Sequence, residues 1–126
     1  MNKKVLVTGG AGSIGSHVVD RCLKAGWDVA VLDNLCTGKK FFLKQHESNS
    51  KLAFVHGDVL DTQVLDQAIS GASIVFHFQA NADVRGGLKN TTVDVEQNIL
   101  ATHRVLEAMK NHNVGKIIFA SSATVY

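Results

Sequence analysis

The sequence contains no proline and is poor in several other residue types. Its 126 residues include two cysteines, one tryptophan and one tyrosine, and the formal net charge at pH 7 is only +2. So small a charge argues against the strongly basic surfaces that bind nucleic acids or anionic membranes. No apolar run approaches the roughly 18 residues of a membrane span, and the first expected strand starts too near Met1 to leave room for a signal peptide. We therefore expect a cytoplasmic protein whose partners include neither nucleic acid nor a membrane.

The cysteines and histidines give no sign of a disulfide or a metal site. Cys22 falls on the apolar side of an expected helix, which predicts buried packing, and it forms no C-x-x-C motif with Cys36. A disulfide between them is not expected in the cytoplasm, where thiols stay reduced. The six histidines are scattered, and none forms H-x-x-x-H with a third ligand nearby. The sequence therefore predicts no bound metal.

What the chain does contain is a regular alternation of apolar runs and amphipathic segments. Hydrophobic residues make up 45% of it and charged residues 19%, which is ordinary for a globular protein, and the length suits one domain. The pattern predicts strands at residues 4–8, 29–32, 52–55, 74–78 and 116–120. It predicts helices at residues 12–25, 62–69 and 92–110, with a short helix near 41–46.

Strands that are apolar throughout and alternate with helices predict a parallel sheet that is covered on both faces. Right-handed crossovers then give an α/β, doubly wound, Rossmann-type sheet with strand order 3-2-1-4-5. Ligands of such sheets bind beyond the carboxyl ends of the strands, here at the switch point between strands one and four. The residues expected on the inner faces of the first and last helices are Ile14, Val18 and Cys22, and Val95, Ile99, Leu106 and Met109.

A glycine-rich turn joins the first strand to the first helix. The run V-L-V-T-G-G-A-G-S-I-G at residues 5–15 contains Gly9, Gly12 and Gly15. Glycine turns the chain with positive φ, and its missing side chain lets backbone amides approach a pyrophosphate at the positive end of a helix. An ordinary glycine turn before a helix is the alternative. The strand–turn–helix context, with Asp33 about 20 residues further on, favours a dinucleotide-binding turn.

Asp33 follows the second strand, where the adenosine ribose of a dinucleotide would lie. Its carboxylate can accept hydrogen bonds from both ribose hydroxyls, each worth about 1.5–3 kcal/mol. The same charge would repel a 2′-phosphate, so we expect NAD to be preferred to NADP by about tenfold or more. The alternative is a surface aspartate at the end of a strand.

Further candidates follow the third and fourth strands. Asp58 can accept from the adenine amine while the Val59 backbone reaches the ring, but a turn or N-cap aspartate fits the same position. The small residues after Phe78 would let the backbone pass beneath the cofactor. Asn98, on the helix that faces this loop, either supports the loop or is merely structural. His77 fits a core histidine better than a catalytic base.

Taken together, these motifs resemble the extended short-chain dehydrogenase/reductase family, in its sugar-nucleotide branch. T-G-G-A-G-S-I-G at residues 8–15 matches the family's T-G-x-x-G-x-x-G. D-N-L-C-T-G at residues 33–38 is similar to the segment that follows the second strand in UDP-glucose 4-epimerases. G-D-V at 57–59, H-F-Q-A at 77–80, Asn98 and S-S-A-T-V-Y at 121–126 follow in family order. The resemblance implies NAD as cofactor, with contacts from Gly9, Gly12, Ser13, Ile14, Gly15, Asp33, Asn34, Leu35, Thr37, Gly38, Asp58, Val59, Phe78, Gln79, Ala80, Ala82 and Asn98.

The resemblance also implies a nucleotide-sugar substrate, a UDP-sugar, and a 4-epimerase reaction. Hydride would pass from the sugar to NAD and return to the other face, while a tyrosinate assisted by a lysine takes the hydroxyl proton. Ser122 matches the family's active-site serine and would bridge the sugar hydroxyl and that tyrosine, and Thr124 is a second expected substrate contact. A strand-end turn is the alternative role of these hydroxyls. Related 4,6-dehydratases carry an Asp-Glu pair where Ala123 and Thr124 stand, so the segment favours an epimerase over a dehydratase or reductase.

One departure from the family concerns the catalytic base. The family's Y-x-x-x-K comes well after the serine segment, but the one tyrosine here is Tyr126, with no lysine after it. We therefore expect residues 1–126 to be the N-terminal NAD-binding part of a larger enzyme, without its later strands and substrate domain, and inactive alone. A non-catalytic NAD-binding module is the alternative. The unpaired edge of the fifth strand predicts a homo-oligomer.

Overall fold

The computed structural model describes residues 3–80 and 88–121, and its elements alternate as the sequence predicts. Each predicted strand is present within one residue of its expected bounds. The strands are β1 (Lys4–Thr8), β2 (Asp28–Asp33), β3 (Leu52–His56), β4 (Ile74–His77) and β5 (Ile117–Phe119). The helices are α1 (Ser13–Lys24), α2 (Thr62–Ile69), α4 (Thr91–Asp94) and α5 (Ala101–Asn111), with a 3₁₀ helix η1 (Lys40–His46) and a π-helix η2 (Val95–Leu100).

The five strands form one parallel sheet in the order β3-β2-β1-β4-β5, which confirms the predicted doubly wound topology. β1 lies at the centre, where Val7 is paired with Val31 of β2 on one side and with Phe76 of β4 on the other. The strand order reverses between β1 and β4, so these two strands border the switch point. Thr8, the last residue of β1, is the register partner of His77, the last residue of β4.

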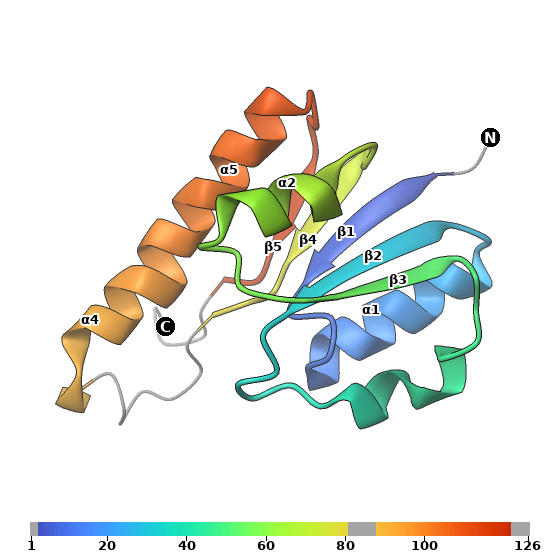
Figure 1. Ribbon diagram of the computed structural model, residues 1–126, viewed down its shortest axis with the longest axis horizontal. Helices are drawn as coiled ribbons and strands as arrows, with labels where there is room; N and C mark the ends of the chain where they lie inside the picture. Colours follow the sequence, from blue (N-terminus) through green and yellow to red (C-terminus); the bar gives the residue numbers. More distant parts are fainter. Residues whose placement is uncertain (1–2, 81–87, 122–126) are drawn as a thin grey trace.

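Helices cover both faces of the sheet, as predicted. α1 and η1 lie on one face, and α2 and α5 lie on the other (Figure 1). Because side chains alternate along a strand, neighbouring residues of β1 enter different cores. Val5 and Val7 pack in the core beneath α1, whereas Leu6 packs in the core beneath α2 and α5. All three are fully buried, which makes β1 the strand on which both layers depend.

The start of α2 and the end of α1 are each fixed by one residue. Asp61 is the N-cap of α2, and its Oδ1 accepts hydrogen bonds from the Gln63 and Val64 amides at 3.1 and 3.4 Å. Such a cap satisfies amides that have no partner inside the helix and stabilises it by about 1 kcal/mol. After α1, Gly26 has a φ of +82°, a conformation that favours glycine at a helix end.

The predicted inner face of the first helix is wrong at Ile14, which is 67% exposed. The buried side of α1 runs instead through Gly15, Ser16, Val19, Cys22 and Leu23, so Cys22 is buried as predicted and Val18 is only half-buried. The reason is the close contact at Gly15: a Cβ added there would lie 2.2 Å from the Gly9 carbonyl oxygen. This contact turns Gly15 toward the sheet and its neighbour Ile14 outward.

The long helix predicted at 92–110 is divided, and its predicted inner face is largely wrong. Val95, Ile99 and Leu106 are exposed, while Met109 is buried as predicted. The buried residues of α5 are Ala101, Val105, Ala108 and Met109. Two alanines on this face let α5 approach the sheet closely, so burial does not follow the largest apolar side chains. The π-helix, with its i→i+5 bonds, also breaks the 3.6-residue period that the prediction carried from Val95 onward.

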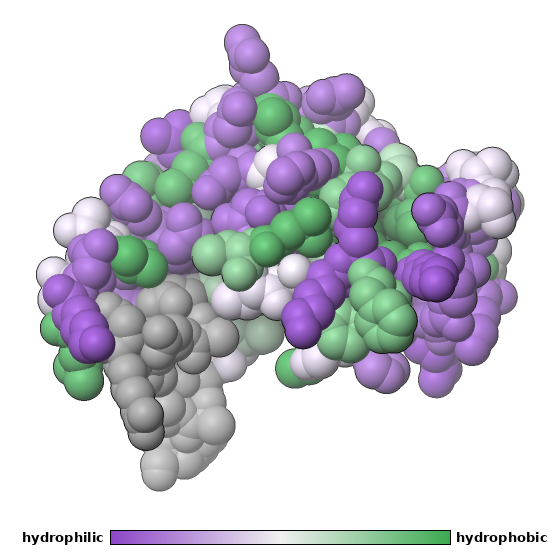
Figure 2. Space-filling view, turned by 60° about the horizontal axis from the view of Figure 1, so that its bottom comes forward, coloured by the Kyte–Doolittle hydropathy of each residue, from purple (hydrophilic) through white to green (hydrophobic). Residues whose placement is uncertain are grey.

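The described surface carries several exposed large hydrophobic side chains, but they are spread over different elements. On the face shown in Figure 2, the apolar colour is interrupted repeatedly by hydrophilic side chains. No helix in the described ranges is long and apolar enough to cross a bilayer. The exposed large hydrophobic residues are Ile14, Phe41, Phe42, Leu88, Val95, Ile99, Leu106, Ile118 and Phe119.

Candidate functional site

The carboxyl edge of the sheet gathers most of the predicted site residues that the structure describes. The glycine turn follows β1, Asp33 ends β2, Asp58 follows β3, and Phe78 follows β4. The Gly9 amide donates to the Leu32 carbonyl at 2.9 Å, which fixes the turn against β2. The parallel topology therefore brings together residues that are far apart in the sequence.

The glycine turn is shaped so that side chains would not fit. Gly9 has a φ of +70°, and a Cβ there would lie 2.9 Å from the Gln79 amide nitrogen. The Gly12 amide donates back to the Gly9 carbonyl at 3.0 Å, closing the turn. Gly12 is also the N-cap of α1, and because it has no side chain it offers no cap to the first amides of that helix. A helix N-terminus built in this way presents backbone N–H groups to an anion.

Asp33 braces the turn from the β2 side. The residue is only 6% exposed, and its Oδ2 accepts from the Ala11 amide at 2.9 Å while its Oδ1 accepts from the Leu35 amide at 2.8 Å. Gly38 packs so closely that a Cβ there would lie 2.8 Å from Oδ2. A carboxylate has about four lone-pair sites, so two amides leave it capacity for further donors. The surface alternative is wrong, because Asp33 is buried and joins two loops.

Asp58 forms a local turn. Its Oδ1 accepts from the Leu60 amide at 2.9 Å, and its carbonyl accepts from the Asp61 amide at 2.9 Å. Val59 is buried with its side chain in the core beneath α2. These contacts favour the turn role that the sequence left open, and contact with an adenine ring stays a prediction.

Thr8 and His77 form the other brace of the glycine turn. The Thr8 hydroxyl lies 2.7 Å from Nδ1 of His77 and accepts from the Phe78 and Gln79 amides at 3.1 and 3.2 Å. Both residues are at most 1% exposed, and burial lowers the pKa of His77 to about 4. The imidazole is therefore neutral at pH 7. This is the core histidine that the sequence favours, with a polar partner that the sequence reasoning missed.

Gln79 and Asn98 lie at the loop and helix that face each other across the switch point. Gln79 Nε2 donates to the Gln97 Oε1, whereas the Gln79 Oε1 is buried and has no partner among the described residues. Asn98 Nδ2 donates to Asp94 Oδ1 at 3.4 Å within the helical segment. A buried acceptor without a donor is costly, so Gln79 marks a place where a ligand donor would be accommodated. The residues present thus fit a bound dinucleotide.

Three predicted site residues, Ala82, Ser122 and Thr124, lie outside the described residues. Two other residues were missed: Thr102 and Gln97, from the segment after α4. The parallel register of β1 and β4 could have indicated the Thr8–His77 contact, since equivalent residues of paired strands lie side by side. Nothing in the local sequence indicates Thr102, because its contact depends on how the π-helix is placed.

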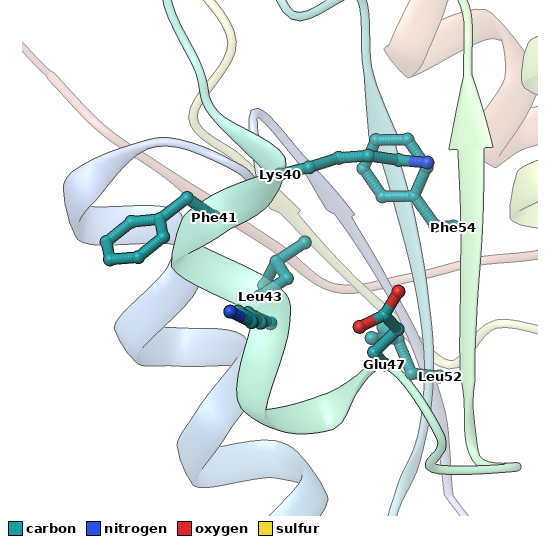
Figure 3. A pocket seen from close by; sticks show the side chains of 7 residues that line it. Lys40, Phe41, Leu43, Glu47, Leu52 and Phe54 are labelled. Atoms are coloured by element: carbon teal, nitrogen blue, oxygen red, sulfur yellow. The ribbon is translucent and has the colours of Figure 1, made fainter.

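Two pockets among the described residues can be placed relative to this edge. Figure 3 shows one of about 550 Å³ between η1 and β3, in which Lys40 lies over the Phe54 ring at 5.0 Å. It contains none of the predicted site residues. A second, open groove of about 840 Å³ along α1 includes Ser13 and Ile14 at the start of the helix. Residues 3–80 and 88–121 hold no cluster of three or more side chains that could ligate a metal.

The fold and this edge define the class: an α/β protein with the architecture of a dinucleotide-binding domain. The model of the NAD dependent epimerase/dehydratase family matches residues 5–126. The chain therefore belongs to that family. A UDP-glucose 4-epimerase of Halalkalibacterium halodurans is 44% identical over 124 residues, which cover 97% of this chain and 35% of the relative.

Solved structures agree with this assignment. A UDP-N-acetylglucosamine 4-epimerase from Methanobrevibacter ruminantium, in complex with UDP-N-acetylmuramic acid, superposes with a TM-score of 0.91 at 36% identity, over 99% of this chain and 39% of that one. A Thermus thermophilus UDP-glucose 4-epimerase in complex with NAD gives a TM-score of 0.83 at 37% identity, over 94% of this chain and 37% of that one. The chain spans little more than a third of the length of the relatives it matches.

Proposed function

We propose that this chain is the NAD-binding part of a UDP-sugar 4-epimerase. The observation that carries the proposal is the glycine turn, which is held between Asp33 and Thr8 at the switch point of the sheet in a member of the NAD dependent epimerase/dehydratase family. Relatives that are 4-epimerases of UDP-sugars support the substrate class, and one of them was solved with NAD. Residues 1–126 form one cofactor-binding unit in this proposal, the N-terminal part of a larger cytoplasmic enzyme.

In the proposed complex the chain holds the cofactor along the carboxyl edge. The amides at the start of α1, around Gly12 and Ser13, bind the pyrophosphate. Asp33 accepts from the adenosine ribose hydroxyls through lone pairs that its two amide donors leave available. Gln79 supplies an acceptor on the nicotinamide side, where its Oε1 has no donor among the described residues. Bound NAD supplies a reversible hydride acceptor.

The substrate side of the proposal rests on residues of the family's serine segment. Ser122 hydrogen-bonds the sugar hydroxyl that loses its proton, and Thr124 is a second contact with the UDP-sugar. The sequence lacks the Y-x-x-x-K pair that would take the proton. The 126 residues by themselves therefore bind NAD weakly and have no epimerase activity. Because β5 is an edge strand of the sheet, they also associate with one another, through that edge or through the α5 surface beside it.

Titration of the 126-residue chain with NAD and, as control, with NADP tests the proposal. We expect calorimetry to show binding of NAD that is about tenfold tighter or more than that of NADP, because the Asp33 carboxylate repels a 2′-phosphate. Equal affinities, or no binding of NAD at millimolar concentration, would contradict it. A coupled assay with UDP-glucose and UDP-galactose should show no turnover, and steady interconversion by this chain would overturn the role assigned to the absent pair.

A further inference from the structure

A series of hydrogen-bonded polar groups, buried at Thr8 and His77 and half-buried at Thr102, crosses the switch point from the glycine turn to the π-helix. His77 contacts Thr8 through Nδ1 at 2.7 Å and Thr102 through Nε2 at 3.2 Å. Thr102 in turn donates from its hydroxyl to the Asn98 carbonyl at 2.6 Å. These hydrogen bonds therefore connect the end of β1 and the end of β4 to the first turn of α5, which holds Thr102, and through it to Asn98 of η2.

The donors and acceptors in this chain can be counted, and they determine the state of His77. The Thr8 hydroxyl oxygen accepts from the Gln79 amide at 3.2 Å and from the Phe78 amide at 3.1 Å, the latter shared with the Thr8 carbonyl oxygen at 3.1 Å, so both of its lone pairs face amide hydrogens. Its own hydrogen must then point to Nδ1 of His77, which accepts. At the other end the Thr102 hydroxyl hydrogen points to the Asn98 carbonyl, so its oxygen accepts from Nε2.

Any other protonation state of His77 leaves a group unpaired. A hydrogen on Nδ1 would be a third donor to the Thr8 oxygen and would leave the Thr8 hydroxyl hydrogen without an acceptor. The doubly protonated imidazolium has the same fault and adds a charge. Because Thr8 and His77 are buried, such an unpaired hydrogen has no water to bond and costs free energy.

We infer that His77 is a positioning residue, held as the Nε2–H tautomer, that couples the π-helix to the amides of Phe78 and Gln79 beneath the proposed NAD. All bonds run one way, from those amides through Thr8, His77 and Thr102 to the Asn98 carbonyl. The Gln79 backbone packs against Gly9, since a Cβ added at Gly9 would lie 2.9 Å from the Gln79 amide nitrogen. A shift of this series of hydrogen bonds therefore displaces the glycine turn. The inference rests on the proposed function only for its effect on NAD.

The surroundings of the imidazole agree with a neutral, fixed ring. Phe119 of β5 stacks on it, with ring centroids 5.9 Å apart. Burial lowers the pKa of His77 to about 4, and each ring nitrogen has a neutral hydroxyl beside it, that of Thr8 at Nδ1 and that of Thr102 at Nε2. Packing and hydrogen bonds thus hold the ring in one orientation and one tautomer.

The tautomer is tested by nitrogen NMR of the uniformly labelled chain at pH 7, without any ligand. We expect Nδ1 of His77 to show the shift of an unprotonated nitrogen and Nε2 that of a protonated one. A protonated Nδ1 overturns the inference, whether or not the chain binds NAD. This readout therefore separates failure of the inference from failure of the proposed function.

The coupling is tested by a double-mutant cycle between Thr102→Val and His77→Phe. Thr102→Val keeps the shape of the side chain, and we expect it to weaken NAD binding by about three- to fivefold and to shift the Phe78 and Gln79 amide resonances. His77→Phe should weaken NAD by about tenfold. In the His77→Phe background, Thr102→Val should have no further effect on either readout.

The control is His103→Phe, which changes an exposed histidine next to Thr102 and should leave NAD affinity unchanged. Additive effects of the two substitutions would overturn the coupling, because they would show that each acts only by local packing. If the wild-type chain fails to bind NAD, the amide resonances alone complete the cycle. If His77→Phe loses its folded spectrum, Thr8→Val takes its place in the cycle, because it breaks the same series of hydrogen bonds at the Thr8 end.

Discussion

The two flanks of the glycine turn are held by different chemistry. On the β2 flank, the ionised Asp33 accepts directly from the Ala11 and Leu35 amides. On the β4 flank, a neutral hydroxyl and a neutral imidazole connect the strand ends through Thr8 and His77. Hydrogen bonds to a charged group are roughly twice as strong as neutral ones, whereas a neutral chain depends on every member being satisfied.

Each kind of anchor suits a different half of the carboxyl edge. In the proposed complex Asp33 would face the adenosine half of the cofactor, where its negative charge would also select against a 2′-phosphate. The β4 flank faces the half in which hydride would be transferred, and a fixed charge there would favour one redox state of the nicotinamide over the other. A neutral brace keeps the backbone in place without that bias.

Breaking the turn itself should have the largest effect, because both flanks depend on it. Gly15→Ala places a Cβ 2.2 Å from the Gly9 carbonyl oxygen, a clash with backbone that cannot rotate away. We expect the free energy of unfolding to fall by about 3 kcal/mol or more. Gly26→Ala is the matched control: its φ is +82° but nothing lies within 4 Å, so it should cost only about 1 kcal/mol. Urea denaturation measures both, and equal losses would contradict the steric explanation.

Asp33→Asn removes the charge from the β2 flank and should have the next largest effect. The carboxamide keeps one acceptor oxygen but turns an N–H₂ group toward one of the two amides. We expect a loss of about 2–3 kcal/mol in the free energy of unfolding, and a preference for NAD over NADP that collapses toward unity. Asp28→Asn, at the other end of β2, is the control and should change neither quantity. A variant that kept the NAD preference would show that the charge of Asp33 does not select the cofactor.

The contribution of His77, on the β4 flank, to the free energy of unfolding should depend on pH. The pKa of His77 is lowered from 6.5 to about 4 by burial, so between these values the unfolded chain binds a proton that the folded chain does not. Stability from this group is therefore complete above pH 6.5 and is lost as the pH falls toward 4. We expect a loss of about 2 kcal/mol between pH 7 and pH 5.

His77→Phe provides the comparison for that pH profile, since it removes the titrating group and leaves the other ionisable residues in place. The variant is less stable at pH 7, but its free energy of unfolding should change about 2 kcal/mol less between pH 7 and pH 5. Parallel pH profiles of variant and wild type would show that His77 is not the group responsible. Chemical denaturation at the two pH values measures the difference.

The two flanks also differ in how far the sequence could predict them. Asp33 follows an apolar run at the spacing of a known fingerprint, so its position at the carboxyl edge was predictable; its two amide partners were not. The Thr8–His77–Thr102 chain was not predicted, because its members are separated by 69 and 25 residues and depend on register and on the π-helix. Local pattern contains no information about such pairs.

The same contrast holds for the fold. Strand order followed from apolar runs and the handedness of crossovers. The inner faces of the helices did not follow, because close packing at Gly15 and Ala101 set the orientation of α1 and α5, whereas the prediction followed large side chains such as Ile14 and Ile99. Small residues determine how closely a helix approaches the sheet, but a prediction from hydrophobic periodicity gives more weight to large apolar side chains.

The central place of β1 has a consequence for how the protein is made. β1 is synthesised well before β4, with which it pairs from Ile74 onward, and its Thr8 hydroxyl bonds to amides about 70 residues later in the chain. While the nascent chain is shorter than that, the edge of β1 that pairs with β4 has no partner strand. Until β4 has been made, that edge is available to other strands, so the delay favours misassembly at β1.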